Sequence, residues 1–275
     1  MRTLPSLPNE DASPFYYSSL TNCGTLVEAD LAAAAAALPD RLVPAPLGGH
    51  AYVSVSYQRY HASYRSSDAV INELEFAVLA FPAGAQSQIP ELDPGQFLAG
   101  HDQSKLIGFF PLSVACDHDA AIAAGTAIFG EPKHRARFDI SVPTWNTRAP
   151  WSSWSVTVDD DDHGGPIATL AMPAISGTAT GALSSITTYG IRDDRLIASR
   201  WQIHTPTALA AAGHGRAPTC RLRFADTDHP MCVAARRLIP TGEVRVAAIW
   251  QHLTPPTGAR YRPFYVQTSI DGDRP

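Results

Sequence analysis

Alternating hydrophobic and polar residues dominate the chain from residue 49 onward. In AYVSVSYQRY (51–60) the valines and a tyrosine alternate with serines, and ELEFAVLAF (73–81) alternates again. A period of two predicts half-buried β-strands. Further short segments of this type follow at regular spacing: KLIGFFPLSV, WSSWSVTV, PIATLAM, DRLIASRWQI, TCRLRF and EVRVAAIW. The pattern therefore predicts a β-rich barrel or sandwich and not a doubly wound α/β sheet.

Helix signals are few and short. Asp30 can cap a helix that runs through an alanine-rich segment to Leu38, and a second helix is predicted from about Pro230 to Leu238. Residues 1–14 are polar and proline-bearing, which predicts an irregular N-terminal arm. No convincing linker divides the rest, so we expect a single domain over residues 15–275.

Residues 83–103 are rich in proline, glycine and glutamine. They predict a long excursion between strands, either a lid or an oligomer contact. The acidic run Asp159–Asp162 is interpreted as a charged hairpin tip and not as a metal loop.

The composition excludes several classes of function. The net charge is -5 and charged residues make up only 17% of the chain, so no basic face is expected for nucleic acid. The longest aliphatic run, at 31–38, is less than half of the ~20 residues that a membrane-spanning helix needs. The four cysteines form no CxxC pair, and residues 1–14 lack the apolar core of a signal peptide. We therefore expect reduced thiols and a cytoplasmic protein. The ten histidines show no recognised metal spacing, so no metal is expected.

Lysine is rare in this chain, and one lysine stands in a distinctive place. Only Lys105 and Lys133 occur among 21 basic residues, and Lys133 directly follows a Gly-Glu-Pro turn. Arginine cannot replace a lysine that acts as an amine nucleophile. Such a lysine must be neutral at the moment of attack, whereas its ordinary pKa is about 10.4.

Burial and neighbouring cations are the two causes that could lower the pKa of Lys133. His134, Arg135 and Arg137 are the candidate cations in the sequence, while Glu131 would oppose them unless it points away. Lys105 has no comparable surroundings and is interpreted as structural.

Two carboxylates share one face of the strand at 73–81. Glu73 and Glu75 are two residues apart, so their side chains point the same way. Burying them without a partner would be costly. They either reach solvent, which the sequence alone favours, or line a polar pocket.

Four segments in order resemble one known family. AIAAGTAIFGEPKH is similar to the segment of acetoacetate decarboxylases in which an AIAxGRE-like run leads through a Y/F-P-K turn to the Schiff-base lysine. LPDRLVPAPL resembles the family's helix-to-strand segment, ELEFAVLAF the strand with the active-site glutamate, and HPMCVAARRL the late helix. The resemblance covers residues 15–250 loosely.

This resemblance implies a β-rich α+β fold with a closed, cone-like β-barrel and a few short helices, often assembled into homo-oligomers. It matches Lys133 to the Schiff-base lysine and Glu73 to the glutamate that orients substrate or moves protons. His134 would tune the lysine or act as an acid or base. The substrate would be a keto acid or a ketone, and no cofactor is required because the imine serves as the electron sink. Whether Glu75 or Glu131 contributes is left open.

Two departures from the family pattern keep several functions open. His134 stands where the decarboxylases have a second lysine, and FYYSSLTNCGTLVEAD (15–30) lacks the arginine that they place near the substrate carboxylate. The first hypothesis is a lyase that decarboxylates a β-keto acid. The second is an aldolase, dehydratase or cyclase on pyruvate-like keto acids, as in secondary metabolism. The third is a ligand-binding member in which Lys133 is not nucleophilic.

Overall fold

The structure is a computed structural model that describes residues 15–64, 67–143, 153–162, 164–175, 185–203, 207–213, 218–239, 244–252, 258–260 and 263–266. The predicted N-terminal arm, residues 1–14, lies outside the described residues, so it stays a prediction. None of the helices in the described ranges is long and apolar enough to cross a membrane.

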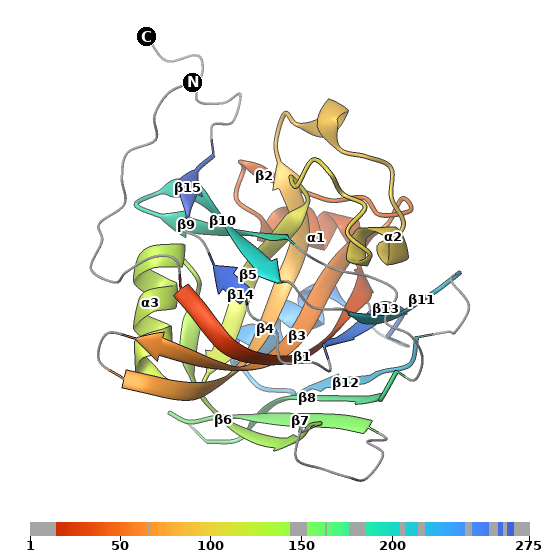
Figure 1. Ribbon diagram of the computed structural model, residues 1–275. Coiled ribbons are helices and arrows are strands. Elements are labelled where there is room, and N and C mark those ends of the chain that lie inside the picture. Colours follow the sequence, from red (N-terminus) through yellow and green to blue (C-terminus); the bar gives the residue numbers. More distant parts are fainter. Residues whose placement is uncertain are drawn as a thin grey trace.

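Seven strands pair in a closed ring (Figure 1). The order around the ring is β5, β9, β10, β14, β1, β3 and β4, and β4 pairs again with β5. The bounds are β1 (Phe15–Ala29), β3 (Ala51–Tyr64), β4 (Ser67–Pro82), β5 (Gly108–Cys116), β9 (Ile186–Arg192), β10 (Arg195–Ile203) and β14 (Gly258–Arg260). Closure leaves these strands without a free edge. The predicted closed β-barrel is confirmed.

Four short strands attach to the ring. They are β2 (Leu42–Pro44) on β4, β13 (Val246–His252) on β1, β11 (Ala208–Ala211) on β13, and β15 (Phe264–Tyr265) on β10. β13 and β14 therefore share one edge of β1, while β3 occupies the other edge.

A second sheet layer continues from β5 along the outside of the barrel. It contains β6 (Lys133–Ser141), β7 (Ser153–Asp160), β8 (Pro166–Pro173) and β12 (Arg221–Phe224), seen at the bottom of Figure 1. β6 lies parallel to β5, and the other pairings in this layer are antiparallel. The chain crosses between the parallel strands through a helix, the usual solution for a parallel connection.

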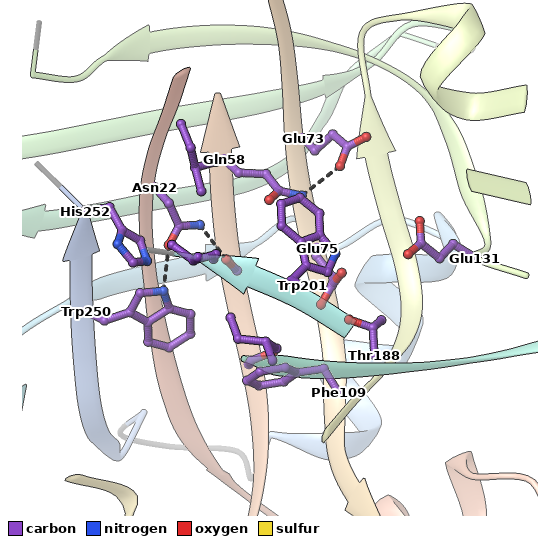
Figure 2. Close-up of a pocket in the computed structure, with 15 residues that line it drawn as sticks. Asn22, Gln58, Glu73, Glu75, Phe109, Glu131, Thr188, Trp201, Trp250 and His252 are labelled. Atoms are coloured by element: carbon purple, nitrogen blue, oxygen red, sulfur yellow. Dashed lines mark hydrogen bonds between the residues drawn. The ribbon is translucent and has the colours of Figure 1, made fainter. Parts of the chain in front are cut away.

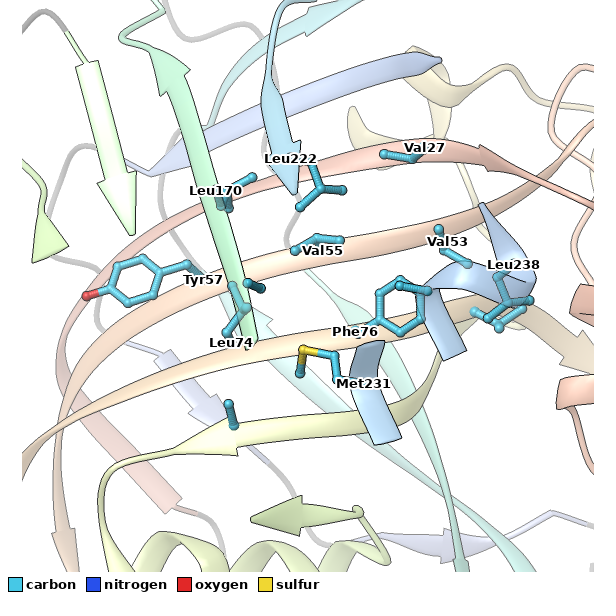
Figure 3. Close-up of a cluster of buried hydrophobic side chains, with 14 of the residues drawn as sticks. Val27, Val53, Val55, Tyr57, Leu74, Phe76, Leu170, Leu222, Met231 and Leu238 are labelled. Carbon is cyan, nitrogen blue, oxygen red and sulfur yellow. The ribbon is translucent and has the colours of Figure 1, made fainter. Parts of the chain in front are cut away.

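The largest hydrophobic core lies between the barrel wall and this second layer (Figure 3). Leu74 and Phe76 point outward from β4 and pack with Leu170 of β8, Leu222 of β12 and Met231. Met231 belongs to α4 (Pro230–Leu238), which has the bounds that the sequence predicts. Each fully buried side chain of this size contributes about 1.5–3 kcal/mol.

Two further helices contribute to hydrophobic clusters at opposite ends of the barrel. α3 (Asp119–Phe129) contributes Phe129 to a cluster with Trp201, and α2 (Pro94–Leu98) contributes Phe97 to a separate cluster with Phe109. Both α2 and the 3-10 turn at Gln86–Gln88 belong to the predicted excursion at 83–103. Because Phe97 and Leu98 are buried, α2 is part of the core at its end of the barrel.

Most of the predicted elements are present. The segments at 51–60 and 73–81 lie within β3 and β4, and α1 (Leu31–Ala37) begins after Asp30, whose carboxylate accepts from the Ala33 amide at 2.7 Å. The strand predicted from Lys105 begins later, at Gly108. Lys105 has a φ of 56°, and the Asp102 carboxylate accepts amide hydrogen bonds from this turn, which delays the strand.

Candidate active site

Lys133 is the first residue of β6 and enters the barrel wall from a tight turn. α3 ends at Gly130, which takes the left-handed conformation with a φ of 64°, and the Glu131–Pro132 turn leads directly to the lysine. The Glu131 amide donates to the Gly125 carbonyl at 3.1 Å. This bond folds the turn back onto α3.

Gly125 makes room for the lysine side chain. A methyl group at this position would lie 2.4 Å from Cε of Lys133, closer than atoms can approach. The helix backbone therefore packs directly against the aliphatic part of Lys133. This contact restricts the conformation of the Lys133 side chain and so the direction in which its amine points.

The Lys133 amine lies between two buried carboxylates. Nζ is ion-paired with Oε1 of Glu73 and lies 3.5 Å from Oε2 of Glu131. Glu73 is 2% exposed and Glu131 3% exposed. Of the two alternatives that the alternation left open, the structure excludes solvent exposure for Glu73 and supports the polar pocket, because the barrel interior provides partners for the carboxylate.

Two neutral groups of β3 hold the Glu73 carboxylate in place. The Tyr60 hydroxyl donates to Oε1 at 2.7 Å, and the Gln58 amide donates to Oε2 at 2.8 Å. Tyr60 also forms an aromatic wall beside the lysine with Tyr17 and Trp201, whose rings stack with centroids 4.9 Å apart. The carboxylate therefore has a single orientation beside the amine.

The pKa of Lys133 is raised well above its usual range. Burial by itself lowers this pKa, but the negative charges of Glu73 and Glu131 outweigh burial. The lysine is an ammonium group in the resting protein. The expectation of a lowered pKa is therefore wrong, because Glu73 and then Glu131 hold negative charge close to the amine.

The predicted cationic neighbours lie away from the amine. Arg135 pairs with Asp119 at 2.6 Å, and both Arg135 and Arg137 approach Asp161 on the partly exposed outer surface. His134 lies in a separate cleft, where its ring is 4.7 Å from that of His229. Adjacent residues of a strand point to opposite faces, which explains the separation of His134 from the Lys133 amine.

Burial, followed by the charge of His229, lowers the pKa of His134 to about 4. His134 is therefore neutral at neutral pH and provides no positive charge to the lysine. The structure brings Lys133 and Glu73 together but does not bring His134 to them. We assign His134 no direct contact with a substrate bound at Lys133.

A cavity extends from the two carboxylates into the barrel (Figure 2). Glu73, Glu75 and Glu131 line it near the lysine, and Trp201 and Phe109 contribute aromatic faces. Its described lining residues include no arginine. The sequence left the role of Glu75 and Glu131 open, and the structure places both beside the cavity.

Polar residues line the cavity on the side away from Glu131. Figure 2 shows Asn22, Trp250 and His252 there, and the Trp250 indole donates to Oδ1 of Asn22 at 2.7 Å. The sequence analysis missed this group. The alternation of serines in β3 was the available signal, since Ser54 and Ser56 face the same cavity.

Within the described residues, no group of three or more histidine, cysteine, aspartate or glutamate side chains could hold a metal ion.

No protein-family model matches the sequence, and no curated protein matches it by sequence. Among solved structures, the chain is similar to the enduracididine biosynthesis enzyme MppR complexed with pyruvate, with a TM-score of 0.66, 14% identity and coverage of 97% of this chain and 92% of that chain. It is similar to a structure of acetoacetate decarboxylase with a TM-score of 0.62, 15% identity and coverage of 97% and 93%. It is also similar to the acetoacetate decarboxylase from Legionella pneumophila, with a TM-score of 0.59 and 13% identity. This match covers 98% of this chain and 94% of that chain.

The chain has the acetoacetate decarboxylase-like fold. The resemblance expected from four short sequence segments is confirmed at the level of the fold. In the acetoacetate decarboxylase-like fold of this chain, β4, β6 and the turn after α3 bring Glu73, Lys133 and Glu131 into contact, and the two glutamates line the adjoining cavity.

Proposed function

We propose that the protein is a Schiff-base enzyme in which Lys133 condenses with the carbonyl group of a keto acid or ketone. The observation that supports this most strongly is the buried amine of Lys133, oriented between Glu73 and Glu131, two carboxylates that line a cavity. A buried lysine with two carboxylates could also be a purely structural ion pair. The adjoining cavity, lined by the same carboxylates, favours a site that binds a substrate.

The raised pKa of Lys133 requires a proton transfer before attack. One of the two carboxylates accepts the ammonium proton when a carbonyl compound has displaced water from the cavity. The neutral amine then attacks the carbonyl carbon, and the carboxylic acid returns its proton to the departing hydroxyl group, so the carbinolamine loses water to form a protonated imine. That imine is a cation, so Glu73 and Glu131 stabilise it as they stabilise the ammonium.

The protonated imine allows two kinds of reaction. In a β-keto acid, the electrons of the bond to the carboxylate move toward the imine nitrogen, carbon dioxide leaves, and an enamine remains. Glu73 passes a proton taken up from solvent to the enamine carbon, and hydrolysis of the resulting protonated imine releases the ketone and restores the lysine ammonium. This sequence is the decarboxylase hypothesis.

The second candidate is an aldol, dehydration or cyclisation reaction of a pyruvate-like keto acid. MppR has been solved with pyruvate and with the condensation product of pyruvate and imidazole 4-carboxaldehyde, which supports this candidate for a similar fold. The described cavity lining contains no arginine that would hold the carboxylate of a small β-keto acid. A homo-oligomer stays a prediction for either reaction.

Reductive trapping tests the proposal. The protein is incubated with pyruvate or acetoacetate and borohydride, and the modified peptide is located by mass spectrometry. We expect an adduct on Lys133, with the chain's other lysine, Lys105, as the internal control. Release of carbon dioxide then separates the two reactions. Failure of every keto compound to modify Lys133 would contradict the proposal and favour a non-catalytic ligand-binding protein.

A further inference from the structure

One row of polar residues crosses the inner wall of the barrel. The strand pairings place Glu73 of β4 opposite Gln58 of β3, Gln58 opposite Asn22 of β1, and Asn22 opposite His252 of β13. All four residues line the same cavity. With neighbouring strands about 4.8 Å apart, the Cα atoms at the two ends of the row are about 14 Å apart. The cavity wall is therefore longer than pyruvate or acetoacetate.

His252 stands at the end of the row away from Glu73. It is 1% exposed, and its Nδ1 lies 3.3 Å from the hydroxyl of Thr207, which is itself fully buried. Burial lowers the pKa of His252 to about 4, so the imidazole is neutral at neutral pH. Nε2 has no hydrogen-bond partner among the described residues, although the side chain lines the cavity. This nitrogen is available to a bound molecule.

Ser54 provides a second unused polar group in the same cavity. Its hydroxyl oxygen is buried and has no hydrogen-bond partner among the described residues. Buried polar atoms in native proteins nearly always have a partner, so this hydroxyl is available to hydrogen-bond a molecule in the cavity.

The strand pairings place Trp250 in the row of residues between the row of His252 and the row of Ser54. Its indole nitrogen is held by Asn22, and its ring fills the space beside Gly24, where a methyl group would lie 2.1 Å from the ring. The indole provides a rigid apolar surface on which a hydrocarbon chain can lie.

We propose that this second end of the cavity, formed by His252, Ser54 and Trp250, binds an uncharged hydrogen-bonding group, such as a hydroxyl, at the far end of an extended keto substrate. A hydroxyl both donates and accepts, so it suits the serine and either tautomer of the imidazole. The described lining residues of the cavity include no lysine or arginine, so burying a carboxylate at this end would be costly. The proposal rests on the Schiff-base function and names the class of its substrate.

A matched set of methyl ketones tests this inference. The probes are 8-hydroxyoctan-2-one, its methyl counterpart nonan-2-one, and the carboxylate 8-oxononanoate. The initial rate of cyanoborohydride-dependent labelling of Lys133 is measured for each at equal, subsaturating concentration, with pyruvate as the reference carbonyl. We expect the hydroxyl probe to label about tenfold faster than the methyl probe, and the carboxylate probe to be slowest, because a site built for a hydrogen bond rejects a group that cannot form it.

Two variants locate the preference. His252→Phe and Ser54→Ala each remove one polar group, and we expect each to bring the hydroxyl-to-methyl ratio closer to one. His101→Ala, at an exposed histidine, should keep the wild-type ratio. Ser54→Ala removes a single oxygen, so it provides the test even if His252→Phe fails to fold.

The outcomes separate this inference from the function on which it rests. If pyruvate labels Lys133 but the hydroxyl and methyl probes label equally in the wild type, the inference is overturned and the Schiff-base function stands. If neither pyruvate nor any probe labels Lys133, the Schiff-base function fails and the inference fails with it. A preference that persists unchanged in both variants would also overturn it.

Discussion

Lys133 and His134 are neighbours in the sequence, yet they lie in two different electrostatic environments on opposite faces of β6. Both side chains are largely removed from water. The pKa of Lys133 is raised because two carboxylates outweigh its burial, whereas the pKa of His134 is lowered by burial and by a second histidine. Both shifts include the cost of burying a charge. The difference shows that the charged groups around each side chain, and not burial alone, decide whether Lys133 and His134 carry a proton at neutral pH.

Removal of the Lys133 amine should have the largest effect. Lys133→Met keeps an apolar side chain of similar length but cannot form an imine, so we expect loss of adduct formation and at least about a 1,000-fold loss of any imine-dependent turnover. The matched control is Lys105→Met, at the chain's other lysine. Substantial turnover in Lys133→Met, measured with the substrate that traps best, would rule out the imine mechanism.

Displacement of the amine should have the next largest effect. In Gly125→Ala the new methyl group would meet Cε of Lys133, and a shift of about 1 Å in a reacting group can cost about 100-fold in rate. Alanine favours a helix by up to about 1 kcal/mol over glycine, so lost helix propensity would not explain a lower rate. Trapping rate and pH profile are compared with those of Thr126→Ala, an exposed position on α3. A wild-type rate and profile in Gly125→Ala would show that the contact does not position the amine.

Removing one of the two carboxylate charges beside Lys133 should change the pH dependence of its trapping rate. Because the folded pKa of Lys133 is raised, the neutral amine forms only in alkaline solution, and the trapping rate should rise with pH. In Glu131→Gln one anionic partner is lost, so we expect the midpoint to move down by about one unit, with about tenfold faster trapping below it. Glu91→Gln, at an exposed site, is the matched control. An unchanged midpoint would mean that Glu131 does not hold the proton on Lys133.

Changes on the other face of β6 should have the smallest effect on the amine. His134→Gln should leave the trapping midpoint of Lys133 in place and the rate within about twofold, since the two side chains share no partner. It should act on stability instead. The folded pKa of His134 is depressed, so the unfolded chain takes up the proton first and wild-type stability falls as pH drops from about 6.5 toward 4. Denaturant unfolding at pH 7 and pH 5 should show a smaller acid loss in the variant than in the wild type.

The sequence was sufficient for the parts of the fold that depend on local patterns. Alternation located β3 and β4, and Asp30 and Pro230 marked the starts of two helices. No helix is predicted for α3 from the sequence, because its glycine and alanine residues leave the hydrophobic periodicity weak. Its tertiary contacts, at Gly125 with Lys133 and at Gly130 with β9, are not visible in the sequence.

The candidate site was predictable only in part. Lys133 and Glu73 could be proposed from the resemblance, but the raised pKa of the lysine depends on how closely Glu73 and then Glu131 approach the amine, which the fold decides. His252 lies 119 positions beyond Lys133 in the chain and reaches the cavity only through the pairing of β13 with β1. Long-range strand pairing is the information that local patterns lack.

The barrel is closed at β14 by only a short stretch of strand pairing. β14, Gly258–Arg260, closes the ring with only three residues, which pair with Phe15–Tyr17 on one side and Trp201–Ile203 on the other. By contrast, β1 and β3 are paired over twelve positions. In amide hydrogen exchange the backbone of β14 should therefore lose protection before that of β3, because fewer bonds must break together. Trp201 and Ile203, which pair with β14, also line the cavity, so this weakly paired closure of the barrel borders the candidate site.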